Sequence, residues 1–242
     1  MTQYTRYLVA TLLLGTLALT GCDRETSEGE ATATAPVVEA PSEAPAAEAP
    51  ATPAATPAPA ASAEAANPDV IMGGEATFGD PNAPVTVIEY ASMTCSHCGG
   101  FHNTTYKQVK EAYIDTGKVK FVFRPFPFDG AALRASMLAS CSGPSRYEAF
   151  TSVIFAQQSQ WAASQDPIGE LKKIARLGGM SGAAFDQCMQ NEALAKSIVA
   201  TRKTGADDFG VRATPSFIIE GKLHSGALSF EQFEEALKPH LP

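Results

Sequence analysis

The feature that most constrains this chain is a pair of cysteines three residues apart, Cys95 and Cys98, in the segment MTCSHC. The run before the pair, PVTVIEYA at 84–91, is rich in β-branched residues and suits a buried central strand. After the pair, apolar residues recur at spacings of three and four up to Gly117, which indicates a helix with one buried face. The two cysteines therefore lie where a strand leads into the first turn of a helix.

This position favours redox chemistry. Residues three apart in a first helical turn are close enough to form a disulfide. Amide donors and the helix dipole stabilise a thiolate at the same place. We expect Cys95 to be the exposed nucleophile and Cys98 to be the shielded, resolving cysteine. A protonated His97 would favour the Cys95 thiolate further; the alternative is that His97 is a solvated surface residue. A pair whose reduced form is stabilised is an oxidant.

Two other uses of the pair fit the sequence less well. A structural metal site needs about four ligands. Cys95, Cys98 and His102 have a suitable spacing, but no second C-x-x-C or H-x-H follows, so we expect no metal. A purely structural disulfide across so short a loop would constrain the unfolded chain little.

The first 68 residues predict export. Residues 8–20 form an apolar run that is too short for a mature membrane span but suits a signal-peptide core. Leu19–Cys22 resembles the bacterial lipobox, so we expect 1–21 to be a lipoprotein signal peptide and Cys22 to carry a lipid. An ordinary secretory signal would export the protein as well. Asp23 suggests, by resemblance, retention at the inner membrane. Residues 22–68, rich in Ala, Pro and Glu, predict a disordered tether.

The net charge of −8 disfavours a nucleic-acid partner, because phosphate binding needs a basic surface.

Beyond the first helix the chain predicts a second strand, a helical block, a hairpin and a last helix. The strand is expected at 118–124. The helices of the block are expected at 131–142, 146–161, 167–177, 182–190 and 192–208. The segment 210–221 then combines a loop, a proline, a strand and a turn glycine, and 222–224 returns as a hairpin. A capping box at Ser229 and Gln232 opens the final helix.

With this order of elements and the segments ASMTCSHCGGF and GVRATPSFIIEGK, the stretch 84–242 resembles the DsbA-like branch of the thioredoxin superfamily. The resemblance implies an α/β protein with a thioredoxin-like fold formed by 69–128 and 199–242, and an inserted helical domain at 129–198. It also implies that Cys95 and Cys98 are the active pair. Pro215 would be the cis-proline beside that pair, leaving the Thr214 backbone free to bind an extended substrate peptide.

The same resemblance assigns three further roles. Glu89 matches a buried acid that relays the proton of the shielded cysteine; the alternative is a strand acid that faces water. Lys120 is then expected as the buried partner of Glu89. Some DsbA-like proteins carry a second disulfide, which predicts a bond between Cys141 and Cys188; the alternative is two buried free thiols.

The resemblance implies a thiol:disulfide oxidoreductase at the periplasmic face of the inner membrane. Reduced or unfolded exported proteins would be its substrates, a membrane quinone-linked thiol oxidase would reoxidise it, and no soluble cofactor is expected. Two departures keep other functions open: Ser96-His97 replaces the usual Pro-His, and Thr214 replaces the usual Val before the proline. A reductase or isomerase, for example in cytochrome maturation, is the first alternative. A non-enzymatic metal-binding lipoprotein is the second.

Overall fold

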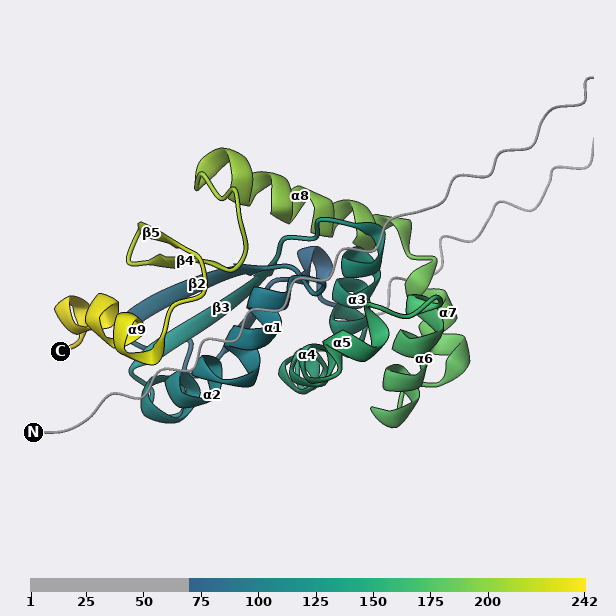
Figure 1. Ribbon diagram of the computed structural model, residues 1–242, viewed down its shortest axis with the longest axis horizontal. Coiled ribbons are helices and arrows are strands. Elements are labelled where there is room, and N and C mark those ends of the chain that lie inside the picture. Colours follow the sequence, from purple (N-terminus) through teal and green to yellow (C-terminus); the bar gives the residue numbers. More distant parts are fainter. Residues whose placement is uncertain (1–69) are drawn as a thin grey trace, which may run out of the picture. The chain divides into compact units, whose positions relative to one another are not determined.

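The computed structural model describes residues 70–242, so the signal peptide, Cys22 and the tether expected at 1–68 lie outside the described residues. Its centre is a five-stranded sheet with the strand order β1-β3-β2-β4-β5 (Figure 1). The central strands β2 (Val85–Ala91) and β3 (Val119–Pro125) are parallel. The other three pair antiparallel with their neighbours: β1 (Ala76–Phe78), β4 (Ser216–Ile219) and β5 (Lys222–Ser225).

The crossover from β2 to β3 carries the cysteine pair. It consists of α1 (Ser96–Asn103), α2 (Thr105–Val109) and η2, a π-helical turn at Lys110–Ile114. The described residues begin with the short 3-10 helix η1 (Met72–Gly74) and end with α9 (Phe230–Leu237) and the 3-10 helix η3 (Lys238–His240). The helices between β3 and β4 are α3 (Gly130–Cys141), α4 (Tyr147–Ala156), α5 (Gln158–Trp161), α6 (Pro167–Leu177), α7 (Gly182–Met189) and α8 (Glu192–Asp208).

Helices cover both faces of the sheet. One face presents Val87, Phe121 and Phe217 to the main core, where Phe217 meets Phe101 of α1 with ring centroids 4.7 Å apart. The other face presents Tyr90 and Ile218 to a smaller apolar cluster that includes Ala206 of α8. Figure 1 shows α8 on the opposite side of the sheet from α1 and α2. The strands of the centre are therefore apolar on both sides, as expected for buried strands.

Local capping explains why most of these helices begin where they do. Side chains of Asp129, Asp166, Ser181 and Asn191 each accept a hydrogen bond from a backbone N–H in the first turn of α3, α6, α7 and α8. Ser229 forms the expected capping box at the start of α9. The helices expected from the sequence start within one residue of the observed ones.

The α/β class and the thioredoxin-like arrangement are confirmed, and three details differ. The edge strand β1 was not predicted, because its three residues are too few to show a periodic pattern. The helix expected at 146–161 is divided at Gln157 into α4 and α5. Gly117 lies just beyond η2 rather than at the end of one continuous helix. Within residues 70–242, none of the helices combines the length and hydropathy that crossing a bilayer requires.

Candidate active site

Cys95 occupies the N-cap position of α1. Its backbone is extended, and its side chain makes no capping hydrogen bond to the first turn. A residue at this position normally accepts hydrogen bonds from the backbone N–H groups two and three residues later. Those groups belong here to His97 and Cys98. A thiolate at Cys95 can therefore take the place of the usual capping oxygen.

The surroundings of Cys95 favour its ionised form. The hydrogen bond from the Cys98 side chain is the largest cause that lowers the pKa of Cys95, from 9.0 to about 5. The Thr214 hydroxyl and the backbone N–H groups of Cys98 and His97 lower this pKa further, and partial burial opposes them. A thiol with a pKa near 5 is about 99% thiolate at pH 7.

Cys98 has the opposite character. It is fully buried, and burial is the main cause that raises its pKa strongly. Its hydrogen bond to Cys95 and the nearby charge of Glu89 raise the pKa further. Both cysteines are free thiols in the structure. One thiol of the pair is therefore partly exposed and has a lowered pKa, whereas the other is buried and has a raised pKa.

The loop before β4 completes the surroundings of Cys95. The Cys95 Sγ lies 3.3 Å from the carbonyl oxygen of Thr214, to which Cys95 donates when it is protonated. The Thr214–Pro215 peptide bond is cis. The Thr214 hydroxyl is buried without a hydrogen-bond partner among the described residues, which leaves it available to donate to a thiolate. Thr214 and Pro215 thus lie directly beside the sulfur of Cys95, although they follow it by almost 120 residues.

His97 contributes through its backbone. Its N–H helps to lower the pKa of Cys95, whereas its imidazole is exposed and forms no hydrogen bond or ion pair within residues 70–242.

Glu89 is fully buried on the face of β2 that α1 covers. Its Oε2 lies 2.8 Å from Nε2 of His102, whose side chain is also buried. The expectation that Lys120 is the partner of Glu89 is wrong. Lys120 is paired with Thr86 in the sheet, and Thr86 points to the opposite face from Glu89 because successive strand residues alternate. His102, for which the sequence suggests only a metal-ligand role, is the partner instead.

Two contacts from the helical segment hold the loop that carries Cys95. The Gln158 side-chain amide, at the start of α5, donates to the carbonyl oxygens of Met93 at 2.8 Å and Cys95 at 2.9 Å. Asp129, which caps α3, also accepts a hydrogen bond of 2.7 Å from the Thr94 hydroxyl. Sequence reasoning missed both contacts, because side-chain bonds between residues tens of positions apart leave no local pattern.

Cys141 and Cys188 form a disulfide with a Cα–Cα distance of 6.1 Å. It joins the end of α3 to the end of α7. No group of three or more His, Cys, Asp or Glu side chains in residues 70–242 is arranged to hold a metal ion.

These observations define a class. A C-x-x-C pair at the start of a helix, an activated first thiol, a buried second thiol and an adjacent cis-proline loop, all on a thioredoxin-like sheet, form a dithiol–disulfide exchange site.

The comparisons with known proteins agree with this class. A family model described as Thioredoxin matches residues 72–239. A relative in Rickettsia felis, named "Putative protein-disulfide oxidoreductase", is 30% identical over 185 residues, which cover 73% of this chain and 66% of that protein. Disulfide bond formation protein D of Bacillus subtilis is 24% identical over 176 residues, covering 69% of this chain and 78% of that protein. The crystal structure of Wolbachia pipientis alpha-DsbA1 is 31% identical, with a TM-score of 0.65 over 71% of this chain and 92% of that one.

The chain therefore belongs to the thioredoxin superfamily, in its DsbA-like branch of disulfide oxidoreductases. It spans 56–66% of the length of the Rickettsia relatives that it matches.

Proposed function

We propose that this protein is an exported, membrane-tethered thiol:disulfide oxidoreductase that oxidises cysteine pairs in secreted proteins. The observation that carries the proposal is the contrast between the two thiols of one pair: Cys95 with its pKa lowered to about 5, and Cys98 buried with its pKa raised. Stabilising the Cys95 thiolate stabilises the reduced pair, and a pair with a stabilised reduced form takes electrons from other thiols.

The reaction transfers two electrons from the substrate to the pair. A substrate thiolate attacks Sγ of Cys95 in the Cys95–Cys98 disulfide, a substrate–Cys95 bond forms, and Cys98 leaves and takes up a proton. The second substrate thiolate then attacks the substrate sulfur of this mixed disulfide. The substrate disulfide forms, and Cys95 leaves as a stable thiolate. Attack at Cys95 is favoured because Cys98 is buried, while Cys95 is partly exposed beside the Thr214–Pro215 loop.

The backbone at Thr214 is the proposed binding site for the substrate chain. Its carbonyl oxygen lies within hydrogen-bond distance of the attacked sulfur. A substrate cysteine that reaches Cys95 therefore brings its own backbone close to Thr214, and Pro215 fixes that segment. Glu89 is proposed to exchange a proton with Cys98, because its charge acts on that thiol inside the core.

We place the protein at the periplasmic face of the inner membrane, as a lipoprotein attached through Cys22. The apolar run 8–20 and the lipobox-like Leu19–Cys22 support this location. Residues 22–68 would be a tether, and 69–128 with 199–242 a thioredoxin-like domain that holds an inserted helical domain at 129–198. A membrane quinone-linked thiol oxidase would return the pair to its disulfide. Replacing Cys22 with Ser should move the exported protein out of the membrane fraction, and unchanged membrane association would contradict the anchor.

The reduction potential tests the direction of electron flow. We expect a value near the −120 mV of DsbA, about 150 mV above that of thioredoxin. The wild-type protein should oxidise a reduced, unfolded protein with two cysteines in stoichiometric amounts, and Cys95→Ser should abolish this. A potential near −270 mV would instead support a reductase.

A further inference from the structure

We propose that His102 is the second member of a proton relay that runs from Cys98 through Glu89 to a pocket between α1, α2 and α4. The inference rests on the proposed dithiol exchange, and it names the route by which the buried thiol gains and loses its proton. The proposal rests on one arrangement: the fully buried carboxyl group of Glu89 is hydrogen-bonded to the imidazole of His102, and His102 lines an open pocket.

Cys98 cannot exchange its proton directly with solvent. It is fully buried, whereas its function requires a protonated thiol in the reduced pair and a thiolate when it attacks Cys95. Proton transfer between a fully buried thiol and solvent needs a group that can both accept and donate a proton inside the core. Glu89 is such a group, but Glu89 is fully buried as well. A proton that reaches Glu89 therefore needs a further carrier.

His102 lies where that carrier must be. It follows Cys98 by four residues in α1, so the two side chains project from the same face of the helix. Its Nε2 is 2.8 Å from Oε2 of Glu89, at side-chain exposures of 2% and 0%. The other carboxyl oxygen, Oε1 of Glu89, is buried without a hydrogen-bond partner in the described part of the chain. Glu89 thus uses one oxygen for His102 and keeps the other free.

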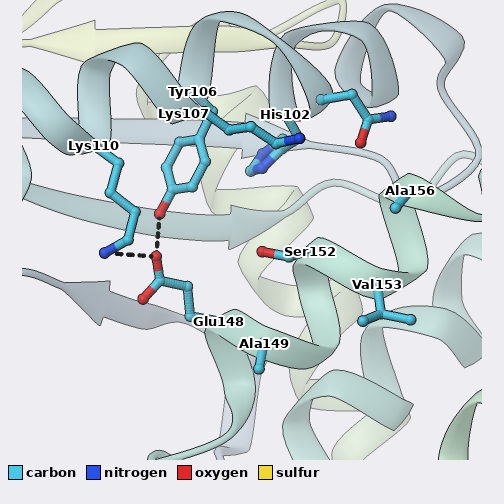
Figure 2. Close-up of a pocket in the computed structure, with 10 residues that line it drawn as sticks. His102, Tyr106, Lys107, Lys110, Glu148, Ala149, Ser152, Val153 and Ala156 are labelled. Carbon is cyan, nitrogen blue, oxygen red and sulfur yellow. Dashed lines mark hydrogen bonds and ion pairs between the residues drawn. The ribbon is translucent and has the colours of Figure 1, made fainter. Parts of the chain in front are cut away.

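The imidazole reaches a pocket of about 480 Å³ that contains neither Cys95 nor the Thr214–Pro215 loop. Figure 2 shows the His102 ring beside Tyr106 in the wall of this pocket. The far wall is formed by α4, from Glu148 to Ala156. Water in the pocket can therefore exchange protons with His102 without passing Cys95 and the Thr214–Pro215 loop, where the substrate is proposed to bind.

Among the described residues, Glu89 is the only hydrogen-bond partner of the His102 ring. Tyr106 and Lys110 both bind the Glu148 carboxylate, as the dashed lines of Figure 2 mark. The groups that face the ring or its partner from the surrounding elements are Glu89 of β2, Cys98 of α1, Tyr106 and Lys107 of α2, Lys110 of η2, and Tyr147 and Glu148 of α4.

Packing alone does not account for a histidine at this position. The ring stacks on Phe155 with centroids 4.3 Å apart and 16° between planes, and it also contacts Tyr106 at 4.8 Å. An apolar ring would make the same contacts. Burying a carboxyl–imidazole pair requires desolvation free energy that an apolar pair would not require. A purely structural role therefore does not explain why Glu89 and His102 are polar.

The proton balance is as follows. When substrate attacks Cys95, the departing Cys98 sulfur takes a proton from Glu89, Glu89 takes one from His102, and His102 takes one from water in the pocket. When the pair is reoxidised, the same transfers run in reverse: His102 releases a proton to water in the pocket, Glu89 passes its proton to His102, and the Cys98 thiol gives its proton to Glu89. No electron moves along this route, because the redox change is confined to the sulfurs.

The test is the reduction of the oxidised protein by excess dithiothreitol, followed by acid quenching and thiol alkylation. His102→Gln keeps a hydrogen-bonding side chain but cannot carry a proton, and we expect it to slow reduction at least 10-fold. Lys107→Gln, in the same pocket wall but exposed and not part of the relay, is the matched control and should react at the wild-type rate. A Glu89→Gln, His102→Gln double variant should be no slower than Glu89→Gln alone.

A second variant separates proton transfer from structure. His102→Ala opens space next to the pocket, and added imidazole should restore its rate in a saturable manner. Wild-type speed in His102→Gln, or a slow His102→Ala protein that imidazole does not rescue, would overturn the relay. Reduction by dithiothreitol needs only the Cys95–Cys98 disulfide. A protein that failed as an oxidase of exported substrates would therefore still report on the relay.

Discussion

Gly99 and Gly100 offer a matched test of how the helical segment holds the active-site loop. Both glycines lie in α1, directly after Cys98. A Cβ at Gly99 would come within 2.5 Å of Oε1 of Gln158, whereas a Cβ at Gly100 would meet nothing within 4 Å. Gly99→Ala must therefore displace the Gln158 amide, and Gly100→Ala leaves it in place.

The magnitude follows from the bonds at stake. Gln158 donates two hydrogen bonds to the loop, to Met93 and Cys95, and each contributes about 0.5–1.5 kcal/mol. Both substitutions replace a helical glycine by alanine, which favours the helix by up to about 1 kcal/mol. Gly100→Ala should be neutral or stabilising. Gly99→Ala should have a free energy of unfolding about 1–3 kcal/mol below that of Gly100→Ala.

Thermal unfolding followed by circular dichroism measures this difference. For a domain of this size the gap corresponds to about 2–12 °C in Tm. Release of the Cys95 carbonyl should also loosen the first turn of α1, so the pKa of Cys95 should rise above 5 in Gly99→Ala alone. Equal melting temperatures and equal Cys95 pKa values in the two variants would refute the clamp.

Three further predictions concern the rest of the described chain. Replacing Cys141 and Cys188 with Ala removes a disulfide that closes a loop of 47 residues. The free energy of unfolding should fall by about 4 kcal/mol and Tm by about 8–16 °C. An unchanged denaturation midpoint would contradict this prediction. Folding lowers the pKa of Cys95, so ionisation of Cys95 stabilises the folded, reduced protein. The stability of the reduced protein relative to the oxidised protein should therefore increase from pH 5 to pH 8.5, and this gain should be lost as the pH falls through 5. A difference in Tm between the two forms that does not change with pH would contradict this. Lys120→Met should leave the rate of disulfide reduction by dithiothreitol unchanged, because Lys120 shares a sheet face with Thr86 and not with Glu89. A slower reaction would indicate that Lys120 does act on Glu89.

The sequence predicts those parts of the molecule whose signals are local. The C-x-x-C pair, the apolar strand before it and the Thr-Pro segment lie within short windows, and together they indicate the thioredoxin-like fold. The capping box at Ser229 and Gln232 gives the start of α9 for the same reason, because a cap and its helix are adjacent in the chain.

The rest depends on contacts between distant residues. The choice between Lys120 and His102 as the partner of Glu89 is decided by which face of the sheet each side chain meets. That can be known only when strand register and helix position are both fixed. The Gln158 clamp requires α5 to lie against the loop after β2, which no pattern near either segment indicates.

The ionisation of Cys95 is the most direct test of the whole account. Thiolate absorbance at 240 nm, recorded from pH 2 to pH 10 on the reduced protein with Cys98→Ala as a comparison, gives its pKa. We predict a midpoint near pH 5 in the wild-type protein and a higher midpoint in Cys98→Ala, because the hydrogen bond from Cys98 is the largest stabilising contact and alanine cannot donate it. A wild-type midpoint near 8.5, the value of a free cysteine, would contradict the proposal that this pair is an oxidant.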